Sequence, residues 1–162
     1  MNAIDQTIDV FFEAYALRFN KSLSGKEADI EGTVNAFADS FVEASPAGIN
    51  SAKNDENFKE AIPKAYDFYK SIGTKSVSIV SKEITPLNEF HSMVKVHWKG
   101  TYIKKDGEQE VIPFDVIYIL QHKEEVPKIF AYITEDEQKI LRKRGLIDKA
   151  APYPGTDQRR QR

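Results

Sequence analysis

An aspartate inside an otherwise apolar segment is the residue of this chain best suited to chemistry. Asp115 lies within the run Val111–Leu120, whose β-branched and aromatic residues are typical of a buried strand. A carboxylate in such a place is costly unless a hydrogen bond or an opposite charge compensates it. Burial also raises the pKa of a carboxyl group, which can then stay protonated and donate to a ligand oxygen. Asp115 is therefore either a buried structural anchor or an acid that acts on a bound molecule.

The preceding hairpin turn predicts which way Asp115 points. The segment 105–108 contains Asp-Gly, a dipeptide typical of a two-residue turn that pairs the residues on either side of it. This register places Trp98 opposite Asp115, on a face that is otherwise apolar. A face of that kind should meet the core, because a slip of one residue would expose it. We therefore expect Asp115 to point inward beside Trp98.

The other face of the same hairpin mixes polar and apolar residues, which suits association with a second copy of the chain. Its expected members are Lys95, His97, Lys99 and Thr101 on one strand and Phe114, Val116, Tyr118 and Leu120 on the next. We therefore predict a homodimer that forms through this outer sheet face.

These residues need a scaffold, and hydrophobic periodicity predicts one. Apolar residues recur at helical spacing in three N-terminal segments, at about 4–21, 30–41 and 55–72. The period then changes to two, which predicts strands at about 76–87, 91–104, 109–122 and 126–133. Thr134 and Glu137 form a capping box that begins a short last helix. The result is an α+β fold, in which a curved, mostly antiparallel sheet wraps around three N-terminal helices.

Aromatic residues of several elements converge on the inside of this predicted sheet. Besides Trp98, they include Tyr66, Tyr102 and Tyr132, with Tyr15 on the first helix. Small-molecule sites combine apolar walls with a few polar groups, so we predict a pocket for a small apolar molecule. Taken alone, Tyr15 and Trp98 are better explained by core packing, and each of the other tyrosines is uninformative, so the prediction rests on their convergence.

The chain resembles the nuclear transport factor 2-like superfamily, which includes SnoaL-like cyclases and ketosteroid isomerases. The resemblance covers about residues 5–133 and rests on the order of the elements and on two segments. Residues 30–48 look like the second helix and following strand of that family, and residues 96–118 look like its central hairpin. The resemblance implies a cone-shaped α+β barrel.

The ketosteroid isomerases also imply a site. They bind a developing oxyanion with a tyrosine of the first helix and a protonated aspartate of the sheet. Tyr15 and Asp115 occupy the matching positions. The catalytic base of those enzymes is an aspartate directly before a Pro-x-Gly sequence, where this chain has Ser45. A serine has no basicity of its own at neutral pH, so steroid isomerisation by that mechanism is not expected, although Ser45 remains a candidate ligand contact.

Composition argues against several other chemistries. The chain has 162 residues, a net charge of −2 and no cysteine, which excludes thiolate chemistry and gives no charge-based reason to expect nucleic acid or a membrane as a partner. The histidines at 91, 97 and 122 form no metal-binding pattern, so no metal or other cofactor is expected. Because no signal peptide or membrane-spanning run is seen, we expect a cytoplasmic protein.

We expect one domain over residues 1–149 and a disordered tail over residues 150–162. Three functions remain open. The chain could bind a small molecule without turning it over, or act as an isomerase, dehydratase or cyclase with Tyr15 and Asp115 as oxyanion donors. It could also be a non-catalytic dimerisation domain.

Overall fold

A computed structural model describes residues 2–147. The helices are α1 (Ala3–Ser24), α2 (Ile30–Asn35), α3 (Glu56–Ser71) and α4 (Glu137–Lys143). The strands are β1 (Phe37–Ser45), β2 (Gly48–Lys53), β3 (Thr74–Asn88), β4 (His91–Ile103), β5 (Gln109–Gln121) and β6 (Lys128–Thr134). The predicted α+β fold is confirmed. The predicted tail over residues 150–162 lies outside the described part of the chain.

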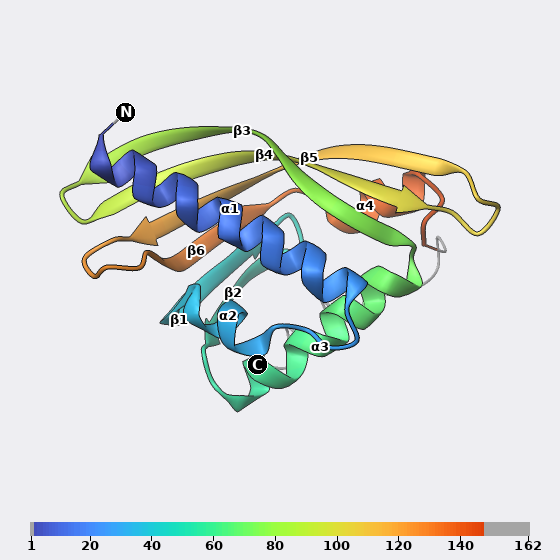
Figure 1. Ribbon diagram of the computed structural model, residues 1–162, viewed down its shortest axis with the longest axis horizontal. Helices are drawn as coiled ribbons and strands as arrows, with labels where there is room; N and C mark the ends of the chain where they lie inside the picture. Colours follow the sequence, from blue (N-terminus) through green and yellow to red (C-terminus); the bar gives the residue numbers. More distant parts are fainter. Residues whose placement is uncertain (1, 148–162) are drawn as a thin grey trace.

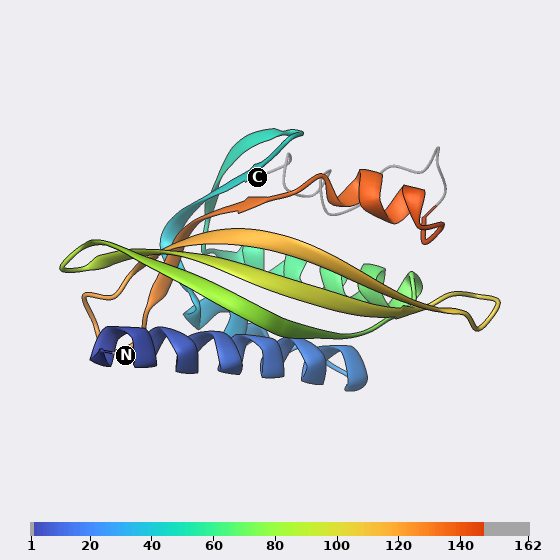
Figure 2. The same ribbon diagram turned by 90° about the horizontal axis from the view of Figure 1, so that it is seen from above.

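The strands form one curved, open sheet. Its order is β2-β1-β6-β5-β4-β3, and all neighbouring pairs are antiparallel except β1 and β6, which are parallel. Helix α1 runs along the long strands β3 and β4, and α3 lies across the open side of the cone (Figure 1). Seen from above, α1 and α4 lie on opposite sides of these long strands (Figure 2). No helix among residues 2–147 is both long enough and apolar enough to span a membrane.

The hydrophobic periodicity was wrong between residues 36 and 53, where it predicted no strand, whereas the family resemblance had implied one strand after the second helix. Helix α2 ends at Asn35 and β1 begins at Phe37, whereas the apolar spacing predicted a helix to about residue 41. Phe37 and Phe41 are four residues apart, a spacing that places both on one face of a helix or on one face of a strand. Both are buried, so the pattern identified the core residues but not the element.

The core lies between α1, α3 and the inner face of the sheet. The even-numbered residues of β4 and β5 form that face, and Val94, Val96 and Leu120 are fully buried there. Phe12 of α1 packs against Tyr118 of β5, with ring centroids 4.9 Å apart. Burial of an apolar side chain of this size contributes about 1.5–3 kcal/mol, so this contact holds α1 against the sheet.

The β4–β5 hairpin has a longer loop than its Asp-Gly dipeptide predicted. The backbone N–H of Lys104 donates to the carbonyl oxygen of Glu108 at 2.8 Å, which leaves three residues in the loop. Gly107 has a φ of +87°, the left-handed conformation that a three-residue loop requires at its last position. The Asp106 carboxylate accepts from the N–H of Glu108 at 2.9 Å. The same dipeptide therefore serves a loop that is one residue longer.

This difference shifts the register by one residue and exchanges the faces of β5. Trp98 pairs with Phe114, and Asp115 pairs with His97. Because side chains alternate along a strand, Asp115 lies on the outer face. The expected inward pair of Trp98 and Asp115 is therefore wrong. The predicted apolar half of the outer face is wrong as well, since Val116, Tyr118 and Leu120 are buried on the inner face.

Candidate functional site

A cavity of about 160 Å³ lies on the inner side of the sheet. Its walls come from α1, α3, α4 and the strands β3 to β6, and most of them are aromatic or aliphatic. An engineered apolar cavity of about 150 Å³ binds benzene, so this one has room for a molecule of at least one ring. The fold therefore leaves a ligand-sized space inside the cone rather than filling it with side chains.

Helix α1 positions Tyr15 above this cavity. The side chain of Asn20 fastens the helix to β3, because its amide donates to the Val77 carbonyl at 2.9 Å and accepts from the Val77 N–H at 2.8 Å. The Tyr15 ring then lies 6.1 Å from that of Trp98 and 6.0 Å from that of Tyr118. These contacts between helix and sheet determine where the Tyr15 hydroxyl can point.

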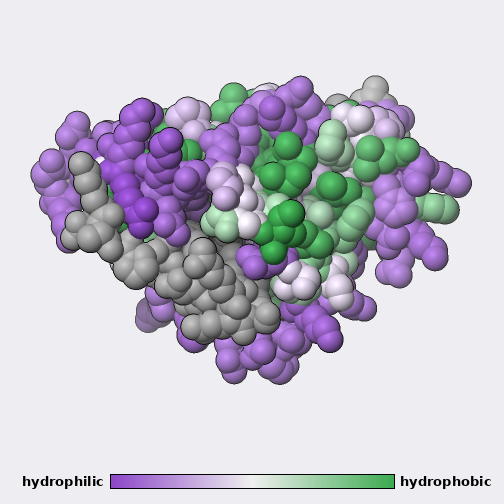
Figure 3. All heavy atoms as spheres, turned by 180° about the vertical axis from the view of Figure 1, so that it is seen from behind, coloured by the Kyte–Doolittle hydropathy of each residue, from purple (hydrophilic) through white to green (hydrophobic). Residues whose placement is uncertain are grey.

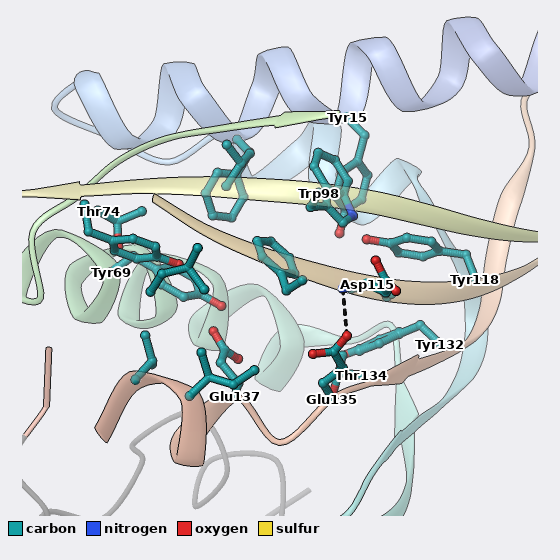
Figure 4. Close-up of a pocket in the computed structure, with 18 residues that line it drawn as sticks. Tyr15, Tyr69, Thr74, Trp98, Asp115, Tyr118, Tyr132, Thr134, Glu135 and Glu137 are labelled. Atoms are coloured by element: carbon teal, nitrogen blue, oxygen red, sulfur yellow. Dashed lines mark hydrogen bonds between the residues drawn. The ribbon is translucent and has the colours of Figure 1, made fainter. Parts of the chain in front are cut away.

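Three neutral hydrogen-bond donors meet at this end of the cavity. Tyr15, Trp98 and Tyr118 are directed toward one another (Figure 4). Trp98 is only 3% exposed, and its Nε1–H has no acceptor in hydrogen-bonding geometry. Its proximity to the Tyr118 hydroxyl favours the ionised form of that group, an effect on the Tyr118 pKa that the opposite effect of burial outweighs. We call these three side chains the donor cluster.

Burial keeps the Tyr118 hydroxyl of this cluster protonated. Loss of hydration raises the pKa of Tyr118 well above its ordinary value, and the neighbouring Tyr15 raises it further. The group therefore donates hydrogen bonds and does not act as a base at neutral pH. The Trp98 Nε1–H is a second donor beside the Tyr118 hydroxyl. The cluster can therefore bind a ligand oxygen that is neutral or that gains negative charge during a reaction.

The far end of the cavity is also polar in places. Thr74 is 5% exposed, and its Oγ1 has no hydrogen-bond partner among the described residues. Burial raises the pKa of Tyr102 well above its ordinary range, and the nearby carboxylate of Glu137 raises it further. Gly100 leaves the space that the Tyr102 ring occupies, since a Cβ there would lie 2.8 Å from the Tyr102 hydroxyl.

A buried carboxylate that the sequence prediction missed lies next to the cavity. Glu43 of β1 is 4% exposed and accepts a 2.5 Å hydrogen bond from the hydroxyl of Tyr132, which lines the cavity. Glu43 was overlooked because its segment looked like the end of a helix and its breaker. The alternation of Phe41 with Glu43 was the available signal, since it places both on the inner face of a strand.

The other predicted residues fall into two groups. Trp98, Tyr102 and Tyr132 line the cavity, together with Tyr15. Two residues lie elsewhere. Tyr66 is buried beside Phe19, and desolvation raises its pKa to about 12. Ser45 lies at the β1–β2 turn, where its hydroxyl accepts from the N–H of Ala47.

Asp115 lies at the mouth of the cavity, but its carboxylate is engaged on the outer face. Its Oδ1 is 2.7 Å from Nδ1 of His97, and its backbone N–H donates to the Glu135 carboxylate at 3.1 Å. Nε2 of His97 is hydrogen-bonded to Glu83. Hydrogen bonds to Glu83 and then to Asp115 raise the pKa of His97. This geometry gives Asp115 a partner and removes the basis for treating it as an inward oxyanion donor.

No group of three or more histidine, aspartate or glutamate side chains within residues 2–147 has the arrangement of a metal site. The residues that face the cavity offer hydroxyl, indole and carboxylate groups instead. The arrangement can therefore bind an apolar molecule, orient its oxygen and, through Glu43 and Tyr132, accept a proton.

Comparison with known proteins identifies the fold family. The model of a family described as NTF2-like protein (DUF6841) matches residues 5–137. No curated protein matches the chain. Among solved structures, Aln2 from a Streptomyces species has a TM-score of 0.62 at 12% identity, covering 88% of this chain and 97% of that one.

Two further structures have a similar fold. A ketosteroid isomerase-like protein from Erwinia carotovora atroseptica has a TM-score of 0.59 at 16% identity, covering 83% of this chain and 97% of that one. A nuclear transport factor 2-like superfamily protein from Salmonella enterica serovar Typhimurium has a TM-score of 0.57 at 12% identity, covering 80% and 87%. At these identities the likeness shows the fold alone.

Proposed function

The chain belongs to the nuclear transport factor 2-like family, and we propose that it binds a small, largely apolar molecule whose oxygen atom accepts hydrogen bonds from the donor cluster. The observation that carries this proposal is the Trp98 Nε1–H, which is buried at the wall of an apolar cavity without an acceptor. A buried donor left without a partner costs about 1–3 kcal/mol. A ligand oxygen at this place would recover that free energy while the rest of the ligand covers apolar walls.

The single tryptophan makes this proposal directly testable, because Trp98 is both a wall of the cavity and the only source of tryptophan fluorescence. Adamantanone, a compact and neutral ketone, should change that fluorescence in a saturable way, and calorimetry should give the same affinity. Mass spectrometry of the natively purified protein should also detect a bound apolar molecule that contains oxygen. A linear, unsaturable fluorescence response together with an empty mass spectrum would contradict the proposal.

An isomerase, dehydratase or cyclase activity is the second candidate, and the pair of Glu43 and Tyr132 favours it. The Tyr132 hydroxyl could take a proton from a ligand carbon while it passes its own proton to the Glu43 carboxylate. The electrons released from that C–H bond would collect on the ligand oxygen, where Tyr15 and Tyr118 could stabilise them. In this scheme Glu43 supplies the base that Ser45 cannot.

Hydrogen exchange at the α-carbon of a simple ketone separates this candidate from binding alone. If proton transfer occurs, the protein should accelerate the exchange of the α-protons of cyclohexanone with D₂O, as followed by NMR. Glu43→Gln should abolish that acceleration while ketone binding persists. An exchange rate equal to that of buffer would rule out this activity for ketones.

We also propose that two copies of the chain associate through the outer face of the sheet. Val42 and Ile133 are 39% and 44% exposed there, next to the half-buried Ile117 and Ile119. Hydrophobic side chains gather on the molecular surface seen from behind (Figure 3). Lys95 and Asp115 lie 3.9 Å apart on this face. In a dimer with a two-fold axis, Lys95 of one copy would meet Asp115 of the other. Association of this kind is compatible with either activity of the cavity.

A further inference from the structure

We propose that the ligand of this cavity is an elongated molecule with two oxygen groups, a carbonyl at the donor cluster and a hydroxyl at Thr74, joined by an apolar middle. A hydroxyketone built on two linked rings represents this class. The inference rests on the proposed binding function and adds to it the number and the spacing of the polar groups of the ligand.

Thr74 is a second buried polar residue of the cavity wall that no protein atom satisfies. It is 5% exposed, and its Oγ1 has no hydrogen-bond partner among the described residues. The same holds for Nε1 of Trp98, which is 3% exposed and lines the same cavity. Buried polar groups in native proteins are nearly always hydrogen-bonded. Two exceptions in one cavity indicate that a ligand satisfies both.

The two groups are too far apart for one oxygen atom. Thr74 is paired with Tyr102 across the sheet, and Tyr102 is four residues from Trp98 along β4. Four residues of an extended strand span about 13 Å. Thr74 and Trp98 accordingly lie at different ends of the cavity (Figure 4). A ligand that reaches both must therefore carry two separate polar groups.

The wall between these ends is apolar. Gly100 lies midway between Trp98 and Tyr102 on β4, and it is paired with Val77 on one side and Ile112 on the other. Val77 and Ile112 both line the cavity. The Tyr102 ring lies over Gly100, where a Cβ would come within 2.9 Å of its Cε1 atom. Apolar rings in the middle of a ligand would cover these surfaces.

The chemistry of the two ends differs. An indole N–H can only donate, and burial keeps the neighbouring Tyr118 hydroxyl protonated, so this end suits a carbonyl oxygen that only accepts. The Thr74 hydroxyl can donate and accept. A ligand hydroxyl has both capacities too and can satisfy Thr74 in either direction.

A matched series of ligands tests the two-point arrangement. The compound 4-(4-hydroxyphenyl)cyclohexanone carries a ketone and a hydroxyl at opposite ends, and we call it the two-headed compound. The compound 4-phenylcyclohexanone lacks the hydroxyl, and 4-cyclohexylphenol lacks the ketone. Calorimetry measures the dissociation constants, because phenols fluoresce in the range of tryptophan. We expect the two-headed compound to bind about fivefold or more tightly than either of the others, since each oxygen meets a group that is already desolvated.

Substitution of Thr74 then assigns the second contact. Thr74→Val keeps the shape of the side chain and removes its hydroxyl, so it should abolish the advantage of the two-headed compound over 4-phenylcyclohexanone. Thr74→Ser restores a hydroxyl and should recover that advantage. Thr101→Val is the matched control, because Thr101 is a half-buried threonine of β4 that does not line the cavity. It should leave the advantage intact.

The outcomes separate this inference from the function on which it rests. Equal affinities of the two-headed compound and 4-phenylcyclohexanone would refute the second contact and leave the binding function standing. The same conclusion would follow if adamantanone binds and the two-ring compounds do not, or if Thr74→Val keeps the full advantage. If no ketone binds, the proposed function fails and the inference fails with it.

Discussion

Replacement of Tyr118 by phenylalanine isolates one donor of the cluster. The change removes a hydroxyl group and keeps the ring, which is 5% exposed and packs against Phe12 at 4.9 Å. The fold should therefore persist. A net hydrogen bond contributes about 0.5–1.5 kcal/mol, which corresponds to a loss of affinity of about two- to tenfold. In the free protein the hydroxyl also lies beside Tyr15 and Trp98, so unfolding free energy should fall by about 1 kcal/mol.

The assay is the affinity for adamantanone, measured by calorimetry because the substitution alters the surroundings of the Trp98 fluorophore. Tyr66→Phe is the matched control. Tyr66 is also a buried tyrosine, 8% exposed, but it does not line the cavity. Its hydroxyl interacts with Ser22, so its removal should lower stability without changing affinity. Full affinity in Tyr118→Phe, or an equal loss in both variants, would refute the role of the donor cluster.

Three further predictions concern the sheet. Asp115→Asn should leave ketone affinity unchanged and lower the pKa of His97, which NMR can follow. Folding raises the pKa of His97 above its unfolded value of about 6.5. Protonated His97 therefore stabilises the fold below pH 6.5, and this stabilisation is lost as the pH rises through the folded pKa. Gly73→Ala should reduce the free energy of unfolding, measured by urea denaturation, by more than about 2 kcal/mol. The reason is that Gly73 has a φ of +85° and a Cβ there would lie 2.0 Å from a backbone oxygen. Gly107→Ala is the control and should cost less, because a Cβ at Gly107 would meet open space. Ile133→Lys should convert a dimer to a monomer in light scattering at micromolar concentration, and an unchanged mass would contradict association through the outer face.

Hydrophobic periodicity was sufficient to predict the fold class, the inward aromatic residues and the approximate ends of most elements. It did not determine the register of β4 and β5, because Asp-Gly is compatible with both a two-residue and a three-residue loop. A single residue of difference moved Asp115 to the outer face and brought Tyr118 inward. The predicted inward position of Asp115 was therefore wrong in the same step, and the role of Tyr15 as an oxyanion donor stays a prediction.

Long-range pairing explains what else the sequence could not show. Glu43 lies beside Tyr132 of the cavity wall because β1 pairs in parallel with β6, which places the two residues opposite each other. Nothing local to residues 37–45 indicates that partner. The apolar pattern there correctly predicted burial. The choice between helix and strand, however, depends on a partner far along the chain. The Tyr132–Glu43 hydrogen bond, which joins residues 89 positions apart, is an example of such a partner.

The structure of the complex with adamantanone tests the central claim most directly. The binding proposal predicts that the ketone lies on the inner side of the sheet, with its oxygen within about 3.2 Å of the Trp98 Nε1 and of at least one hydroxyl of Tyr15 or Tyr118. A ketone bound outside the cone, or one whose oxygen points toward the mouth at Glu135 and Glu137, would contradict it.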